Sequence, residues 1–78
     1  MSSAAFDNPA VFIRVFVLDA TQEEMAKRLN MSQANVSYFE KEHGKIPENY
    51  RPPVKKWAKE LGKRIPDEWF EKVPTMIA

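Results

Sequence analysis

The sequence contains no cysteine, which excludes disulfide bridges and cysteine-ligated zinc and is typical of a reducing compartment. It also lacks a long apolar run, because residues 10 to 18 are interrupted by Arg14 and fall far short of the ~20 residues of a membrane-spanning helix. The first five residues carry no basic group of the kind that opens a secretion signal. We therefore expect a cytoplasmic protein without a membrane segment.

Residues that enzymes use for catalysis are scarce and scattered. The chain has two glycines and no glycine-rich phosphate loop, no nucleophile beside a base, and no pair of carboxylates in an evident cleft. Its single histidine, His43, has no cluster of metal ligands around it and is better interpreted as a cation near a helix C-terminus. With 78 residues the chain forms one small domain. We expect no enzymatic activity, no metal site and no cofactor.

Charge is nearly balanced but unevenly distributed. A net charge of +1 at pH 7 is too small for binding nucleic acid by bulk positive charge. Residues 51 to 64 nevertheless hold six basic side chains and one acidic side chain, whereas residues 21 to 46 hold four of each. The six are Arg51, Lys55, Lys56, Lys59, Lys63 and Arg64. Two interpretations remain open for them, a solvated helix face and a surface that contacts phosphate.

Strong helix signals begin at Thr21. Thr21 and Glu24 have the spacing of a capping box, in which each side chain accepts a hydrogen bond from the backbone of the other residue. Asn30 tolerates the left-handed conformation that ends a helix, so we predict a helix from Gln22 to residue 29. Its narrow apolar stripe consists of Met25, Ala26 and Leu29.

A second helix is predicted from Gln33 to His43, with Ser32 as its N-cap and Gly44 as its C-terminal stop. Val36 and Phe39 form its buried side. At about 100° per residue, the opposite face consists of Ala34, Ser37, Tyr38 and Lys41, with Asn35 and Glu40 on the two flanks. Small side chains at the centre, an amide at the leading end and a cation at the far end suit a helix that enters a DNA groove.

The segment from Gln22 to Lys41 resembles the helix-turn-helix of the lambda-repressor-like family, which includes Cro, phage repressors and XRE-type proteins. Ala26, Asn30, Val36 and Phe39 match its small, turn and bulky apolar positions, and residues 32–37 match the usual opening of its recognition helix. Asn30 stands where the family usually has glycine. The resemblance covers about half the chain and implies a small Cro- or repressor-type transcription regulator, with a phage origin suggested by size and family.

The resemblance implies that the partner is double-stranded DNA, read in the major groove by the helix that starts at Gln33. The protein would act as a homodimer on a near-palindromic operator, because one helix reads only a few base pairs. Gln33 would pair with an adenine edge, and Lys41 and Lys45 would meet phosphate. The predicted DNA-binding set is Gln22, Ser32, Gln33, Ala34, Asn35, Ser37, Tyr38, Lys41 and Lys45. An alternative remains, a helical protein-interaction module of the antirepressor or antitoxin type.

The segment before this motif has conflicting signals. Asn8 and Pro9 form a good helix start, yet residues 11 to 18 have the β-branched content of a buried strand. The capped helix that follows and the resemblance favour a helix from Pro9 to about Asp19. Its expected core positions are Phe12, Val15, Phe16 and Leu18, which leaves Val11 and Val17 on the surface.

The C-terminal part begins with a proline-punctuated connector, in which Pro47 to Tyr50 can form one helical turn. Val54, Trp57, Ala58 and Leu61 then predict an amphipathic helix that ends at Gly62. A short fifth helix is expected from Pro66 or Asp67 to Lys72.

Taken together, these segments predict an all-α compact bundle of about five short helices. It forms a single domain over residues 1–78, with the helix-turn-helix at 21–43 and the C-terminal helices at 53–73. The expected shared core is Ala26, Leu29, Val36, Phe39, Trp57 and Leu61. The candidate dimer surface is Val11, Val17, Trp69, Phe70, Val73, Met76 and Ile77.

Overall fold

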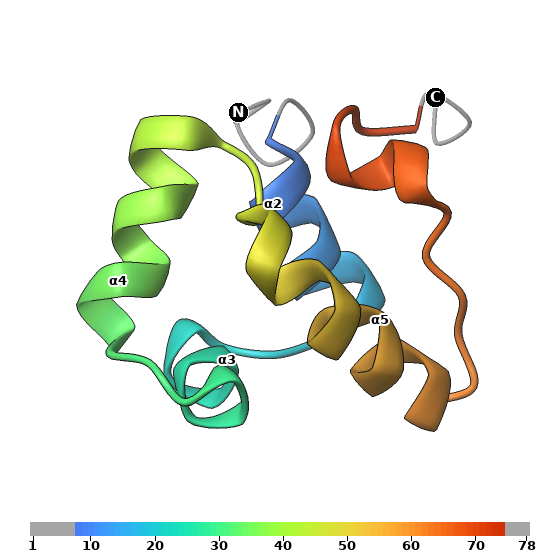
Figure 1. The fold of residues 1–78 in the computed structure, drawn as a ribbon, viewed down its shortest axis with the longest axis horizontal. Helices are drawn as coiled ribbons and strands as arrows, with labels where there is room; N and C mark the ends of the chain where they lie inside the picture. The colour runs from blue at the N-terminus through green and yellow to red at the C-terminus, as the bar shows by residue number, and fades with distance from the viewer. Residues whose placement is uncertain (1–7, 75–78) are drawn as a thin grey trace.

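The computed structural model describes residues 8–74, and every regular element in this part of the chain is helical. The α-helices are α2 (Pro9–Phe12), α3 (Gln22–Leu29), α4 (Gln33–Tyr38) and α5 (Arg51–Glu60). π-Helical segments Ile13–Val17 and Phe39–His43 extend α2 and α4, and 3-10 turns occupy Glu48–Tyr50 and Asp67–Phe70. In Figure 1, α3 is seen almost end-on, α4 rises beside it along the left edge, and α5 lies to the right.

The all-α prediction is confirmed, but the described part of the chain has four α-helices rather than five. The segment expected as the fifth forms only the short 3-10 turn Asp67–Phe70. Trp69 N–H donates to the Pro66 carbonyl at 2.9 Å and Glu71 N–H donates to the Glu68 carbonyl at 3.1 Å, and these hydrogen bonds over three residues give the segment its 3-10 character. No helix within residues 8–74 has the length and apolar character needed to cross a bilayer.

The first helix forms despite its strand-like composition. Pro9 occupies its first turn, and the Asn8 side chain accepts a hydrogen bond from the Val11 amide at 3.1 Å. The helix is shorter than predicted, because Leu18 N–H closes a wide turn on the Ile13 carbonyl at 2.9 Å and Asp19 has a φ of 51°. Local capping and the packing of one helix face therefore outweigh the intrinsic propensity for a strand.

The wide π-turn also corrects the predicted inner face of this helix. Val15 and Phe16 are 39% and 49% exposed, whereas Val17, expected on the surface, is 6% exposed. A π-turn closes from residue i to i+5, so positions after Ile13 no longer follow the period of 3.6 that underlay the prediction. Phe12 and Leu18 are buried as predicted.

The predicted signals around α3 and α4 are confirmed. Both hydrogen bonds of the Thr21–Glu24 capping box are present, at 3.0 and 2.8 Å. Asn30 adopts the left-handed conformation with φ 59°, and Ser32 Oγ accepts from the Asn35 amide at 3.1 Å. Gly44, with φ 67°, ends the π-helical continuation of α4.

One hydrophobic core joins all of these elements. Five of the six predicted shared core residues are in it, and Leu61 is the exception with 47% exposure. Leu61 lies beyond the end of α5 at Glu60, where the chain turns away through Gly62 with φ 77°. The core residues are Ala10, Phe12, Ile13, Val17, Leu18, Ala20, Met25, Ala26, Leu29, Val36, Phe39, Ile46, Val54, Trp57, Ala58, Ile65 and Phe70.

Candidate nucleic-acid interface

The outward face of α4 consists of short and polar side chains. Gln33 and Ala34 are exposed and Ser37 is half-buried, while Val36, on the opposite side, is fully buried. Within residues 8–74, neither the Gln33 amide nor the Lys41 ammonium has a hydrogen-bond or ion-pair partner. The helical period therefore predicted this face correctly, and its polar groups are available to a ligand.

The two polar residues at the start of α4 differ in availability. Ser32 Oγ is engaged as the cap acceptor, although its hydroxyl proton can still be donated. Asn35 is exposed, and its amide makes only a weak contact of 3.7 Å with the sulfur of Met31. The amide of Asn35 can therefore turn toward a stronger partner at small cost.

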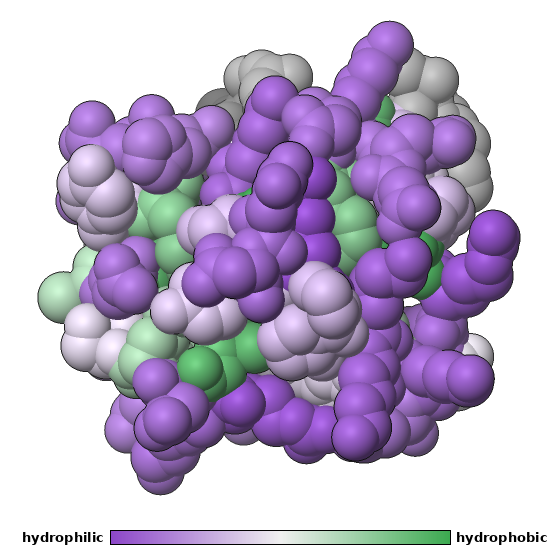
Figure 2. All heavy atoms as spheres, viewed as in Figure 1, coloured by the Kyte–Doolittle hydropathy of each residue, from purple (hydrophilic) through white to green (hydrophobic). Residues whose placement is uncertain are grey.

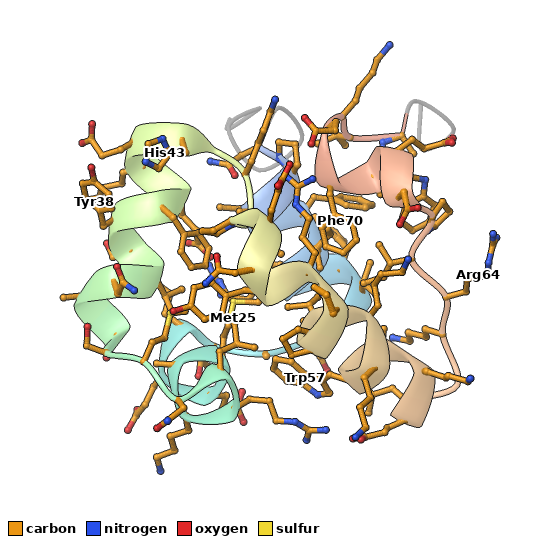
Figure 3. All side chains as sticks on the ribbon, in the orientation of Figure 1. Met25, Tyr38, His43, Trp57, Arg64 and Phe70 are labelled. Atoms are coloured by element: carbon orange, nitrogen blue, oxygen red, sulfur yellow. The ribbon has the colours of Figure 1, made fainter. Side chains whose placement is uncertain are left out.

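Tyr38 is 56% exposed, as expected, and its ring contacts His43. The two ring centroids are 5.5 Å apart in an edge-to-face arrangement with an interplanar angle of 82°. Figure 3 shows both rings at the outer edge of α4, away from the core. The contact restricts the Tyr38 ring and leaves its hydroxyl on the outer surface of the helix.

A buried polar network that was not predicted from the sequence lies behind this face. Glu40, predicted on a flank of the helix, is only 4% exposed. Its Oε2 accepts from Arg14 Nε at 2.6 Å, and its Oε1 accepts from Arg14 Nη2 at 3.3 Å and from Gln22 Nε2 at 2.9 Å. One signal for it was present in the sequence, because a single arginine inside an apolar run needs a buried acidic or polar partner.

The network and the neighbouring backbone contacts fix α4 against the rest of the molecule. Asn8 Nδ2 donates to the Glu40 carbonyl at 2.7 Å, and Ala10 N–H donates to the Gly44 carbonyl at 3.1 Å. Arg14 also donates through Nη1 to the Ala20 carbonyl at 3.0 Å. The C-terminal end of α4 and its π-helical extension is thus held by α2 and the N-terminal end is capped by Ser32, so the outward face has a defined orientation.

Lys45, one of the predicted phosphate ligands, has an internal partner. Its Nζ lies 2.8 Å from Glu71 Oε1, while Arg51 Nη1 donates to Glu71 Oε2 at 2.7 Å. These hydrogen bonds, that of Lys45 first, lower the pKa of the Glu71 carboxyl from its usual 4.5. Of the two predicted lysines, Lys45 is therefore engaged, whereas Lys41 is unpaired within the described residues.

The basic stretch 51–64 does not belong to this face. Lys55 pairs with Asp67 at 2.6 Å, and Lys63 donates to the Val17 carbonyl at 2.8 Å. In Figure 3, Arg64 lies at the right edge of the molecule and Tyr38 at the left edge, the two ends of its longest axis. Arg28, on α3, stacks on Trp57 with 5.1 Å to the ring centroid and pairs with Glu60.

The polarity of the surface over α4 is mixed. In Figure 2 the left side of the molecule carries mostly purple, white and pale green residues, with small areas of stronger green between them. On the face that Figure 2 shows, the described residues on this side form no broad apolar patch of the kind that favours a protein partner. Within residues 8–74, no three histidine or acidic side chains gather in a way that could hold a metal ion.

Two of the residues proposed for a dimer surface are buried, and three others within the described residues are partly buried. Val17 and Phe70 are 6% and 1% exposed and belong to the core. Trp69 packs edge-on against Phe12 with 5.8 Å between ring centroids, and Val73 packs against the same core. Val11 is half-buried, and Met76 and Ile77 lie outside the described residues.

Comparisons with protein-family models, with curated protein sequences and with solved structures yield no match for this chain.

Proposed function

We propose that this chain is a sequence-specific DNA-binding transcription regulator of the small Cro or repressor type, which reads the major groove with α4. The observation that carries the proposal is the outward face of α4, where short and polar side chains lie on a helix that is held at both ends, and where Gln33 and Lys41 have no hydrogen-bond or ion-pair partner within residues 8–74. A major groove about 12 Å wide admits one helix if the side chains between helix and base edges are short. Ala34 and Ser37 meet that requirement at the centre of the face.

Gln33, at the N-terminal tip of α4, is the first residue that we assign to base recognition. Its amide can accept and donate a hydrogen bond at once, which matches the N6 and N7 edge of adenine. Asn35 offers a second amide on the flank, held only by its weak contact with Met31. Both amides can therefore bind bases without breaking a strong hydrogen bond inside the protein.

Phosphate contacts are assigned to both ends of α4. Lys41 is exposed and unpaired in the described chain, and the Ser32 hydroxyl can donate from the other end. Gln22 uses one amide hydrogen on Glu40 and keeps the second for a phosphate oxygen. Lys45 has two further donors besides the one directed at Glu71, so its contribution is added to an existing ion pair.

The arrangement of α3 and α4 supports the resemblance to the lambda-repressor-like helix-turn-helix. Three residues join the helices, with Asn30 left-handed at the first and Ser32 capping α4 at the third. We therefore assign α3 to the role of the first helix of that motif and α4 to the role of its recognition helix.

The decisive experiment is a selection of random DNA duplexes by the purified full-length chain, followed by sequencing of the bound pool. We expect a recovered consensus with two inverted half-sites. If repeated rounds enriched no sequence, the proposal would be overturned and the protein-interaction alternative would take its place.

A further inference from the structure

The strongest concentration of positive charge in the described chain lies in a surface cavity far from α4. The cavity has a volume of about 530 Å³ and is lined by Lys55, Lys56 and Lys59 of α5 and by residues 63–67. We call it the lysine cavity. Its volume falls within the range of pockets that hold small ligands, about 300 to 1,000 Å³.

The charges around the lysine cavity are far from balanced. Five cationic side chains line it, and Asp67 is the only carboxylate among the lining residues. Because the whole chain carries a net charge of only +1, the remaining residues together carry −3. The excess of positive charge is therefore a property of this cavity and not of the chain as a whole.

The acidic groups near the lysine cavity neutralise little of this charge. Asp67 is highly exposed, and its pKa is lowered by the hydrogen bond from Lys55 and further by the charge of Arg64. Glu60, the only acidic residue of α5, is paired with Arg28 instead. Within residues 8–74, Lys56 and Lys59 have no hydrogen-bond or ion-pair partner.

The position of the lysine cavity separates it from a duplex bound to α4. Arg64, at its rim, and Tyr38, on α4, lie at opposite ends of the longest dimension of the molecule, which is 33 Å. A straight duplex in contact with α4 would leave the cavity facing away from it. The cavity is therefore open to a different anion.

We propose that the lysine cavity binds a compact polyanion with two or more phosphate groups, such as a polyphosphate or a nucleoside polyphosphate. Lysine ammonium groups each offer three donors on flexible stems, which suits phosphate oxygens that approach from several directions. Three lysines on α5 and two cations on the following loop surround a volume that one small ligand can fill. This proposal is independent of DNA recognition by α4.

The test titrates the full-length chain with sodium tripolyphosphate at constant ionic strength, followed by calorimetry and by NMR of backbone amides. We expect saturation at one ligand per chain, weaker binding of orthophosphate, and shifts centred on residues 55–67. The double variant Lys56→Gln/Lys59→Gln should weaken binding about tenfold or more, because it removes two charged donors. The control Lys27→Gln/Lys72→Gln makes the same change in net charge on exposed lysines elsewhere and should alter binding little.

Equal losses in the two double variants, or shifts spread over all lysines without saturation, would overturn the proposal in favour of diffuse charge attraction. A second arm adds a duplex without the selected operator. A contrary result would be that the duplex displaces tripolyphosphate and loses as much affinity for the Lys56→Gln/Lys59→Gln variant as tripolyphosphate does. In that case the lysine cavity would bind the phosphates of nucleic acid, and the small-ligand proposal would be wrong. Gln33→Ala should leave the tripolyphosphate titration unchanged, so failure of this site and failure of DNA recognition are distinguishable.

Discussion

The carboxylate of Glu40 is only 4% exposed and accepts hydrogen bonds from Arg14 and Gln22, so three separate segments of the chain meet at one side chain. A buried ion pair contributes little net stability compared with a well-packed apolar pair, but removing one partner leaves the other charge uncompensated. Glu40 is therefore a residue whose loss should be costly even though it touches no ligand.

We expect Glu40→Ala to lower the free energy of unfolding by about 3 kcal/mol or more, a large fraction of the total for a small domain. Urea denaturation followed by circular dichroism measures this change. Glu42→Ala removes the same charge from an exposed position nearby and should cost within about 0.5 kcal/mol. Similar losses in the two variants would show that the Arg14–Glu40 pair has no special role in stability.

Gln33 and Lys41 should affect DNA binding in different ways. Gln33→Ala should lower operator affinity by about 1 to 3 kcal/mol and relax the preference at one position of each half-site. Lys41→Ala should weaken all sequences alike and reduce the salt slope by about one unit per site. Binding titrations across operator variants and salt concentrations separate the two effects. An identical, sequence-independent loss in both variants would contradict base reading by α4.

Glu71 gives a pH-dependent contribution to stability with a defined sign. Lys45 and Arg51 lower the pKa of the Glu71 carboxyl from its usual 4.5. The ion pairs therefore stabilise the folded state fully at pH values above that usual pKa, and this stabilisation is lost as the pH falls through the lowered pKa. We expect the urea concentration at the midpoint of unfolding to be slightly higher for wild type than for Glu71→Gln near neutral pH. In stronger acid the two midpoints should be equal. Glu68→Gln, at an exposed carboxylate without an ion pair in the described chain, is the matched control. A wild-type advantage over Glu71→Gln that persists unchanged into acid would contradict this assignment.

The helices around α4 are short, and the backbone conformation at their ends determines where each helix stops. Both α2 and α4 are extended by a π-helical segment that closes on the next non-helical residue, Leu18 N–H to Ile13 O and Gly44 N–H to Phe39 O, each at 2.9 Å. The turn between α3 and α4 depends on Asn30 in the left-handed region. Asparagine adopts that conformation at lower cost than β-branched residues, although glycine does so at the lowest cost.

We therefore expect Asn30→Val to destabilise the protein by about 1 to 2 kcal/mol, because a β-branched residue is strained at positive φ. Asn30→Gly should stay close to wild type, since relief of strain offsets the greater freedom of the unfolded chain. Thermal unfolding provides the measurement. Asn49→Val, at an exposed position that does not have positive φ, is the matched control and should have a smaller effect. If Asn30→Val were as stable as wild type, the left-handed turn would not govern this corner.

At the level of the whole molecule, the proposed DNA face and the lysine cavity lie at opposite ends of a body measuring 33 × 27 × 20 Å. Two such bodies on successive turns of one duplex face would have centres ~34 Å apart, a separation at which neighbouring copies can touch. Burial of Val17 and Phe70 removes them from the dimer surface proposed from the sequence. Val11, Trp69 and Val73, which keep partial exposure, remain the candidates within the described residues.

We expect two copies of the chain to bind one near-palindromic operator, and sedimentation at rising concentration with and without operator measures the stoichiometry. Trp69→Ala should weaken this assembly. Because the substitution also removes a packing contact with Phe12, the thermal stability of the variant has to be measured as well. Exposed Leu61→Ala changes an apolar side chain outside the proposed surface and serves as the control. A strictly monomeric protein, on and off its operator, would contradict the dimer.

Features that depend on neighbours a few residues apart could be predicted from the amino-acid sequence alone. The capping box at Thr21, the cap at Ser32, the left-handed Asn30 and the inner and outer sides of α4 were all predictable, because each rests on contacts within one or two helical turns. The burial of Trp57 in α5 was predicted correctly for the same reason, because it follows from the local helical period.

Contacts between groups that are distant in the sequence could not be predicted in this way and became known from the folded structure. Arg14 and Glu40 are 26 residues apart, Lys45 and Glu71 equally so, and no local spacing links either pair. The exposure of Phe16 and Leu61 likewise follows from a π-turn and a helix end that a uniform helical period cannot anticipate. Local backbone preferences act over a few residues, whereas pairing and burial depend on the packing of the whole chain around one core, and this packing also brings the lysines of α5 and Arg64 to one cavity.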